Sequence, residues 1–110
     1  MSSVSDQIKT IIDQNPVVLF MKGAKNRPQC GFSSFVVQAL NKLSVDYHDI
    51  DVLTDPDIRQ GIKDFSDWPT IPQLYIQGEF MGGADIVRDM MQNDELKILL
   101  QEKGLIDQVS

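Results

Sequence analysis

The sequence predicts an α/β protein in which helices flank a mixed four-stranded sheet. Three observations carry this prediction. Apolar residues recur at helical spacing in several segments, Val17–Met21 is a short apolar run, and Gln77-Gly78 separates two strand-like stretches. A helical connection makes the first two strands parallel, whereas a tight turn makes the last two antiparallel. We expect a single domain over residues 1–110, with a core over about 4–100 and a short C-terminal tail.

The first half of the chain alternates between helix and strand. Apolar residues at helical spacing predict a first helix that ends at Asn15-Pro16. The apolar run Val17–Met21 predicts a strand that is covered on both faces. Residues 22–29 are polar and contain glycine and proline, which predicts a loop. Helical spacing returns over Ser33–Leu43, and partial alternation over Val45–Val52 predicts a second strand.

The third helix and the hairpin follow. Asp55 is a good helix cap and Pro56 suits the first helical position, so we expect a helix that runs to about Phe65. Leu74–Ile76 and Glu79–Met81 flank a two-residue turn and form the predicted hairpin.

Two helices complete the predicted order. Gly82-Gly83 breaks the strand pattern, and a helical stretch begins at about Asp85. A further short helix near Glu95–Gln101 precedes a tail that we expect to fray around Gly104. The methionines at positions 81, 90 and 91 are predicted to fill the core or its margin.

Composition excludes several classes of function. The apolar content is 42% and the charged content is 24%, as in ordinary soluble globular proteins. A net charge of −6 and the absence of a basic stripe argue against nucleic-acid binding. No apolar run reaches the roughly 20 residues that a membrane span needs, and the N-terminus lacks the pattern of a signal or transit peptide. A lone cysteine indicates a reducing compartment, so we expect a cytoplasmic protein or, alternatively, a processed protein of an organellar matrix.

Cys30 is the only cysteine, and it lies where the predicted loop meets the second helix. A helix N-terminus favours the thiolate, and the Lys22 ammonium at the end of the first strand adds to this effect. A thiolate is both the nucleophile of disulfide exchange and a ligand of iron. The alternative is a buried structural cysteine, which is less consistent with the neighbouring Gly31. Cys30 cannot close a disulfide within the chain, so a second sulfur must come from another molecule.

Other segments have both a binding and a structural interpretation. A cis bond before Pro72 would expose the main chain of Ile71 to an extended ligand, but a plain turn with Trp68 as a core anchor is the simpler interpretation of this segment alone. The N–H groups of Ala84 and Asp85 at a helix start suit a carboxylate, although Asp85 in isolation is more simply a cap.

Three further residues with ionisable side chains are Arg59, Lys63 and His48. Arg59 and Lys63 lie four residues apart and form either a basic clamp or solvated surface. His48, the only histidine, lies beside Asp49 without a further partner, and we assign it no role.

Together, these segments resemble the monothiol glutaredoxins of the Cys-Gly-Phe-Ser type, the bacterial glutaredoxin 4-like family. The resemblance covers roughly Val4 to Leu100. It rests on ordered motifs: Met21-Lys22-Gly23, Pro28-Gln29-Cys30-Gly31-Phe32-Ser33, Asp55-Pro56-Asp57-Ile58-Arg59, Trp68-Pro69-Thr70-Ile71-Pro72-Gln73 and Gly82-Gly83-Ala84-Asp85. A lone Cys-x-x-Ser pattern would be weak support, whereas several motifs in order are strong support.

The resemblance implies a thioredoxin-like fold with a cis proline at Pro72 and a groove for glutathione. By position, Lys22 and Arg59 would bind the glycyl carboxylate of glutathione. The main chain of Ile71 would pair with its cysteinyl part, and Ala84 and Asp85 would hold its γ-glutamyl end. Relatives often carry Cys or Ser where this chain has Ala84, so an accessory disulfide with Cys30 is excluded.

The resemblance also implies a [2Fe–2S] cluster held between the two protomers of a homodimer. Such a cluster commonly takes four thiolates, and two Cys30 side chains with two glutathiones would supply them. The implied partners are BolA-type proteins and apo iron–sulfur proteins, and the implied function is cluster storage or transfer.

Two other functions compete with cluster transfer. The same groove suits a glutathione-dependent oxidoreductase that removes glutathione from protein mixed disulfides, an activity that we expect to be weak. Oxidoreductase relatives commonly have proline after the cysteine, whereas Gly31 leaves space for a cluster. A regulatory protein that senses iron or redox state is the third interpretation.

Overall fold

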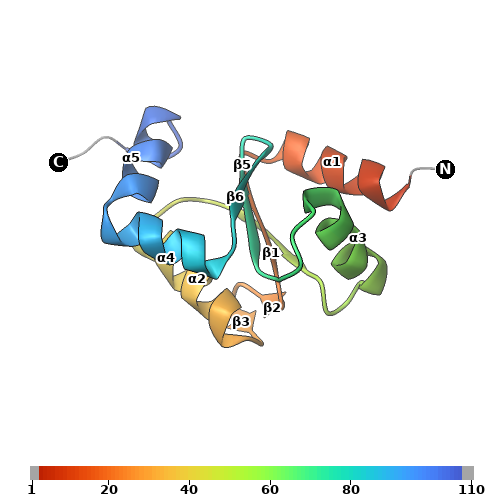
Figure 1. The fold of residues 1–110 in the computed structure, drawn as a ribbon. Helices are drawn as coiled ribbons and strands as arrows, with labels where there is room; N and C mark the ends of the chain where they lie inside the picture. The colour runs from red at the N-terminus through yellow and green to blue at the C-terminus, as the bar shows by residue number, and fades with distance from the viewer. Residues whose placement is uncertain (1–2, 108–110) are drawn as a thin grey trace.

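The computed structural model describes residues 3–107 and places a mixed sheet between two layers of helices (Figure 1). The sheet contains β1 (Val17–Met21), β4 (His48–Asp51), β5 (Gln73–Ile76) and β6 (Glu79–Gly82), in the order β4-β1-β5-β6. β1 and β4 are parallel, whereas β5 is antiparallel to both β1 and β6. The predicted mixed four-stranded sheet is therefore confirmed.

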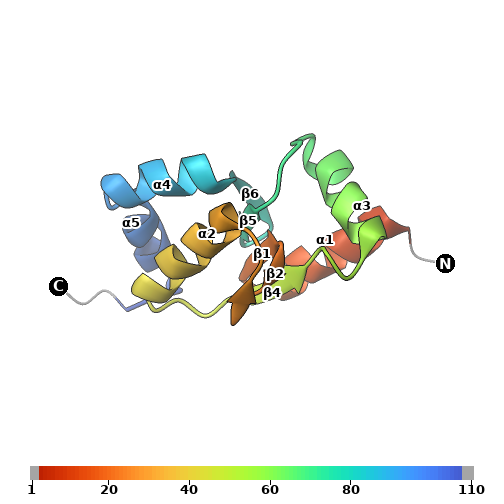
Figure 2. The same ribbon diagram turned by 90° about the horizontal axis from the view of Figure 1, so that it is seen from below.

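The helices divide between the two faces of this sheet (Figure 2). α1 (Val4–Gln14) and α3 (Pro56–Ser66) cover one face, and α2 (Gly31–Lys42), α4 (Ala84–Gln92) and α5 (Glu95–Glu102) cover the other. Each helix packs an apolar stripe on the sheet, and this separates the buried side chains into two clusters, one on each face.

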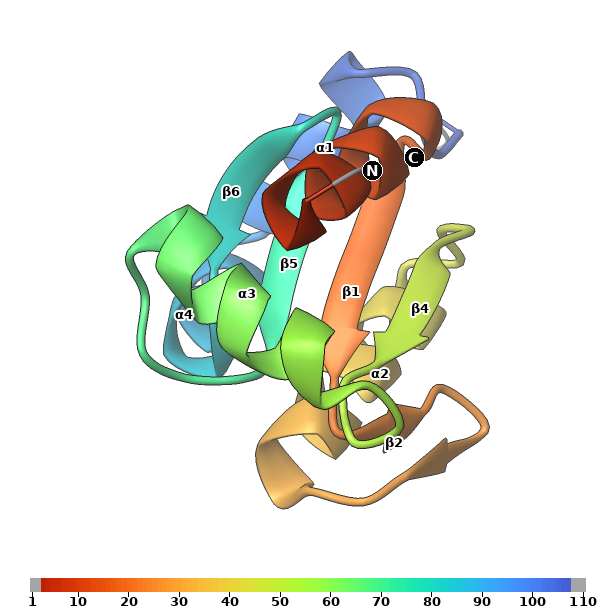
Figure 3. The ribbon, with the colours of Figure 1, turned by 90° about the vertical axis from the view of Figure 1, so that its right-hand side faces the viewer.

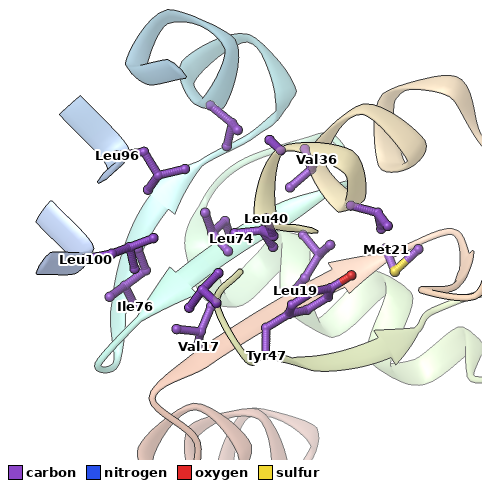
Figure 4. Packing of buried hydrophobic residues seen from close by; sticks show 14 residues of the cluster. Val17, Leu19, Met21, Val36, Leu40, Tyr47, Leu74, Ile76, Leu96 and Leu100 are labelled. Carbon is purple, nitrogen blue, oxygen red and sulfur yellow. The ribbon is translucent and has the colours of Figure 1, made fainter. Parts of the chain in front are cut away.

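β1 is the centre of both clusters, because all five of its residues are buried. Val17, Leu19 and Met21 point into the cluster with α2, α4 and α5, part of which Figure 4 shows. Val18 and Phe20 point into the cluster with α1 and α3. Burial of one such side chain contributes roughly 1.5–3 kcal/mol, so the strand can hold the residues at its C-terminal end in place.

The loop predicted over residues 22–29 contains a small hairpin instead. β2 (Gly23–Ala24) pairs with β3 (Arg27–Pro28), and Figure 3 shows this hairpin beyond the C-terminal end of β1. Carboxylates of β4 hold it: Asp51 accepts a hydrogen bond from the Gly23 N–H at 2.9 Å, and Asp49 accepts one from the Lys25 N–H at 2.8 Å. The prediction missed the hairpin because its support comes from residues far away in the sequence.

Two other predicted elements change length. The strand predicted over Val45–Val52 shortens to β4, because only His48 to Asp51 pair with β1, and β4 is the edge strand of the sheet over the described residues. The helix predicted from Ser33 begins at Gly31, with Cys30 as its N-cap residue.

The C-terminal end also differs from the expectation. We predicted fraying around Gly104, but Leu105 donates its N–H to Leu100 O at 2.9 Å, and Leu105 and Ile106 pack against the core. Gly104 has a φ of 71°, which is the left-handed conformation that commonly ends a helix. The methionines at 81, 90 and 91 are partly buried against the same cluster, which confirms their predicted place at its margin.

Candidate functional site

A cavity of about 340 Å³ opens where the ends of several elements meet. Its lining comes from Lys22 after β1, from Cys30 and Phe32 at the start of α2, and from Lys63 on α3. The segment 68–72 before β5 and the segment 83–86 at the start of α4 complete it. Residues from four separate motifs of the sequence therefore meet around one thiol.

Cys30 is the N-cap residue of α2, with φ −147° and ψ 137°. Its carbonyl accepts the first helical hydrogen bond, from the Ser34 N–H at 2.8 Å, while its thiol is only partly buried. The side chain therefore stands beside the unpaired N–H groups that begin every helix. A structural cysteine inside the core is excluded.

This position lowers the pKa of the Cys30 thiol below its ordinary value. The backbone N–H of Ser33 is the largest cause, and partial burial opposes it. The N–H of Phe32 and the Lys22 ammonium lower the pKa further. The predicted contributions of the helix start and of Lys22 are thus confirmed in direction, and both make ionisation of the thiol easier.

Ser33 is a polar residue next to the Cys30 thiol, behind the cavity lining, and the sequence reasoning gave it no role. It is fully buried, and its Oγ accepts a hydrogen bond from the Lys22 N–H at 3.1 Å. The Lys22 carbonyl accepts one from the Gln29 N–H at 2.9 Å. Ser33 therefore joins the end of β1 to the start of α2. The sequence did contain a sign of this role, because the Ser33 hydroxyl follows Cys30 by three positions, which is helical spacing.

Gly23 permits the turn that follows Lys22. It has a φ of 90°, and an added Cβ would lie 2.6 Å from both Arg27 O and Gln29 N. No other residue fits such a contact in this conformation. Gly31 is the opposite case, because an added Cβ there would meet no atom within 4 Å, so the structure leaves open space next to Cys30.

The segment 68–72 forms another part of the lining. The bond between Ile71 and Pro72 is cis, as the family resemblance implied. Within the described residues, the N–H and C=O of Ile71 make no hydrogen bond, so they are available to an extended ligand. The interpretation of Trp68 as a core anchor is wrong: its side chain is 39% exposed, lines the cavity and lies 5.8 Å from the Phe80 ring.

The third part of the lining is the start of α4. Gly83 is the N-cap residue and provides no side-chain cap, and Val87 donates the first hydrogen bond back, to Gly83 O at 3.1 Å. The interpretation of Asp85 as a cap is therefore wrong, because it lies within the helix and its carboxylate is 3.7 Å from Arg88. The N–H groups of Ala84 and Asp85 remain at an open helix start that lines the cavity.

The basic residues divide between the cavity and its surroundings. Lys22 and Lys63 line the cavity, whereas Arg59 lies one turn earlier on α3, outside the lining. Lysines on one side and an uncapped helix start on the other suit a small molecule with an anionic group at each end. His48 is exposed on the edge strand β4, away from the lining.

The described residues were also compared with the requirements of a metal site built from one chain and of a membrane span. Between residues 3 and 107, no three His, Cys, Asp or Glu side chains gather closely enough to hold a metal ion. Over the same range, no helix combines the length and the apolar character that a membrane span requires. A metal bound at this cavity would find Cys30 as its only thiolate from one chain.

The fold and the site define a thioredoxin-like protein with one partly exposed thiol in its cavity. The sequence profile of the glutaredoxin family matches residues 17–81. Probable monothiol glutaredoxin 2 of Rickettsia typhi is 55% identical over 96 residues, which are 87% of this chain and 86% of that protein. The chain therefore belongs to the glutaredoxin family, and within it to the monothiol glutaredoxins.

Solved structures agree with this assignment. A monomeric truncated mutant of Trypanosoma brucei 1-C-Grx1 superposes with a TM-score of 0.87 at 38% identity, over 100% of both chains. A buckwheat glutaredoxin in complex with glutathione superposes with a TM-score of 0.81 at 25% identity, over 94% of this chain and 92% of that one. The predicted thioredoxin-like fold is confirmed.

Proposed function

We propose that this chain binds glutathione in the cavity and, as a homodimer, carries a [2Fe–2S] cluster that it stores or transfers to apo-proteins. The observation that carries the proposal is the placement of the chain's one thiol. Cys30 is partly exposed, has a lowered pKa, and lies in a cavity whose other walls suit a small anionic peptide. The similarity to a glutaredoxin described as a complex with glutathione supports this choice of ligand.

We assign each part of glutathione to a different part of the lining. The ammonium groups of Lys22 and Lys63 would attract the glycyl carboxylate, with Arg59 as the cation implied by the family resemblance. The unpaired main chain of Ile71 would pair with the cysteinyl part. The open start of α4 at Ala84 and Asp85 would receive the γ-glutamyl carboxylate, and the Asp85 side chain its ammonium.

Cluster binding then follows from the number of thiolates. A [2Fe–2S] cluster commonly takes four, and one chain supplies only Cys30. Two chains and two glutathiones complete the set, and the open space beside Gly31 leaves room next to the sulfur. Because half of the ligands are bound non-covalently, the cargo can be released to an apo-protein. A BolA-type protein in place of one protomer would change how readily the cluster is released.

A second candidate function is supported by the lowered pKa of the Cys30 thiol. The Cys30 thiolate attacks the glutathionyl sulfur of a protein mixed disulfide, and the protein's sulfur leaves as a thiolate. A second glutathione thiolate then attacks the glutathionyl sulfur on Cys30. This step releases oxidised glutathione and restores the Cys30 thiolate. Both functions use the same cavity and suit a reducing compartment such as the cytoplasm.

Anaerobic reconstitution separates the two functions. The chain is mixed with iron, sulfide and glutathione, and absorption spectra and gel filtration are recorded. Cluster transfer predicts a coloured dimer that requires glutathione and is lost in Cys30→Ser. The matched control is Cys30→Ser with Thr10→Cys, which keeps one thiol per chain but moves it to an exposed position on α1. It should stay colourless.

Other results would count against cluster transfer. A colourless monomer of the unmodified chain with fast removal of glutathione from a mixed disulfide would contradict it and favour the enzyme. A coloured product from the control with a thiol at position 10 would show that any exposed thiol suffices. Separate Arg59→Ala and Lys63→Ala variants decide which cation holds glutathione, since only the one in contact should weaken binding.

A further inference from the structure

Gln73 is a fully buried polar side chain that the function above does not use. It is the first residue of β5 and pairs with Phe20 of β1. Its Nε2 donates to two carbonyls of the cavity wall, Trp68 O and Thr70 O, each at 3.2 Å. Its Oε1 accepts a hydrogen bond from the Tyr75 hydroxyl at 3.2 Å. The amide therefore uses both of its N–H groups and its carbonyl oxygen.

The two main-chain carbonyls decide which way this amide faces, because a carbonyl can only accept a hydrogen bond and so requires the N–H groups of Gln73. Tyr75 holds the other end of the amide. Its hydroxyl can be a donor only while it keeps its proton, and burial raises the pKa of Tyr75 to about 12. Its ring is packed among Phe20, Phe65 and Phe80, with centroid distances of 5.6, 6.4 and 5.4 Å. A rigidly packed hydroxyl thus donates to the carbonyl oxygen of Gln73, and the amide is held at both ends.

The buried amide depends on both of these hydrogen bonds. The hydrogen bonds from Gln73 to Trp68 O and Thr70 O are partly buried, whereas the Gln73 side chain is fully buried. The amide has no access to water, so the opening of either bond would leave a buried N–H group unpaired and destabilise the folded state. The amide therefore holds the segment 68–70 to the sheet, and Ser66 adds a bond from the other side through the Trp68 N–H at 3.1 Å.

We propose that Gln73 is a positioning residue, which holds the segment 68–71 in the shape that receives glutathione. The inference rests on the proposed binding of glutathione. It predicts that Gln73 acts on ligand affinity through the main chain of the segment 68–71. The pKa of Cys30 should stay unchanged, because the groups that shift it are Ser33, Phe32 and Lys22.

The first test measures glutathione affinity by titration calorimetry in the full chain. Gln73→Leu keeps most of the volume and removes the amide, and we expect its affinity for glutathione to fall by about tenfold. Tyr75→Phe removes only the hydroxyl and should cause a smaller loss. The matched control is Leu74→Val, the next residue on β5, which points to the other face and should lower thermal stability with unchanged affinity.

Two further readouts separate positioning from general loss of structure. The pH profile of Cys30 alkylation should be the same in Gln73→Leu as in the unmodified chain. Trp68 is the only tryptophan, so its fluorescence reports on this wall without any ligand. Quenching of that fluorescence by acrylamide should increase in Gln73→Leu and stay unchanged in Leu74→Val.

The outcomes distinguish the two proposals. Unchanged affinity in Gln73→Leu, or an equal loss in Leu74→Val, would overturn the role of Gln73. If Gln73→Leu does not fold, unchanged affinity in Tyr75→Phe would overturn it as well. If the unmodified chain does not bind glutathione, the proposed function fails. The positioning of the wall is then judged by Trp68 fluorescence alone, and unchanged quenching in Gln73→Leu would overturn it.

Discussion

The helix starts of this protein fall into two groups. α1 and α3 are capped by side chains: the Ser3 hydroxyl accepts a hydrogen bond from the Asp6 N–H at 3.1 Å, and the Asp55 carboxylate accepts one from the Ile58 N–H at 3.2 Å. α2 and α4 begin at Cys30 and Gly83, and neither start has a side-chain cap. The starts of α2 and α4 line the cavity, whereas the capped starts of α1 and α3 do not.

The difference shows how the fold separates stability from binding. A side-chain cap occupies N–H groups that would otherwise attract an anion. At Cys30 these groups favour a thiolate, and at Gly83 they face the space that we assign to a carboxylate of glutathione. α5 also begins without a side-chain cap, but its start at Asp94 lies outside the cavity lining, so a missing cap alone does not define a site.

Placing a cap on α4 should have the largest effect on binding. In Gly83→Asp the new carboxylate would occupy the open N–H groups and repel the ligand, and its Cβ would lie 3.2 Å from Pro72 O and 3.4 Å from Trp68 Nε1. We expect glutathione affinity, measured by calorimetry, to fall by at least about tenfold, or 1.4 kcal/mol.

Removal of a cap elsewhere is the control for this variant. Asp55→Ala should lower the free energy of unfolding by about 1 kcal/mol in urea and leave glutathione affinity unchanged. An undiminished affinity in Gly83→Asp would show that the start of α4 does not hold the ligand.

A change at the start of α2 should have an intermediate effect, on the cluster only. Gly31 is the first residue of this helix, where proline is well tolerated, and Cys30 has the extended conformation that a following proline requires. Gly31→Pro should therefore fold and bind glutathione, while the ring fills the space beside the sulfur. We expect the cluster absorbance per chain to fall several-fold after reconstitution. If the cluster absorbance per chain of Gly31→Pro equalled that of the unmodified chain, the space beside the sulfur would not be needed for cluster binding.

The smallest expected effect concerns the charge beside Cys30. Lys22→Met removes an ammonium that favours the thiolate, so the pKa of Cys30 should rise toward its ordinary value. The midpoint of iodoacetamide alkylation against pH should move up and the rate at neutral pH should fall. The change should be small, because the backbone N–H of Ser33 is the larger cause. Lys97→Met, an exposed change on α5, should leave the profile in place.

The same pKa has a consequence for stability. Because it is lowered in the folded chain, it stabilises the fold at pH values above the ordinary thiol pKa. This contribution is lost as the pH falls through the lowered pKa.

The alkylation experiment has one contrary outcome. If Lys22→Met left the alkylation midpoint unchanged, the Lys22 ammonium would have no part in lowering the pKa of Cys30.

Local patterns predicted most elements but not their contacts. Val17–Met21 was identified as a buried strand from its unbroken apolar run, and Asp55 as a cap from its position before Pro56. The hairpin β2–β3 was missed, because its supporting carboxylates come from β4. The cap assigned to Asp85 was wrong because Gly83, which looked like a break, is the residue that begins α4.

By itself, the sequence determined that one thiol stands at the start of a helix after a buried strand, and that any further sulfur must come from outside the chain. These properties depend on neighbours in sequence, so a local pattern records them. Only the tertiary structure decided that Lys63 lines the cavity while Arg59 does not. It also decided that Ser33 joins Lys22 to α2, and that Gln73 is bonded to the segment 68–70. Those contacts join separate elements, and they form only when both faces of the sheet are packed.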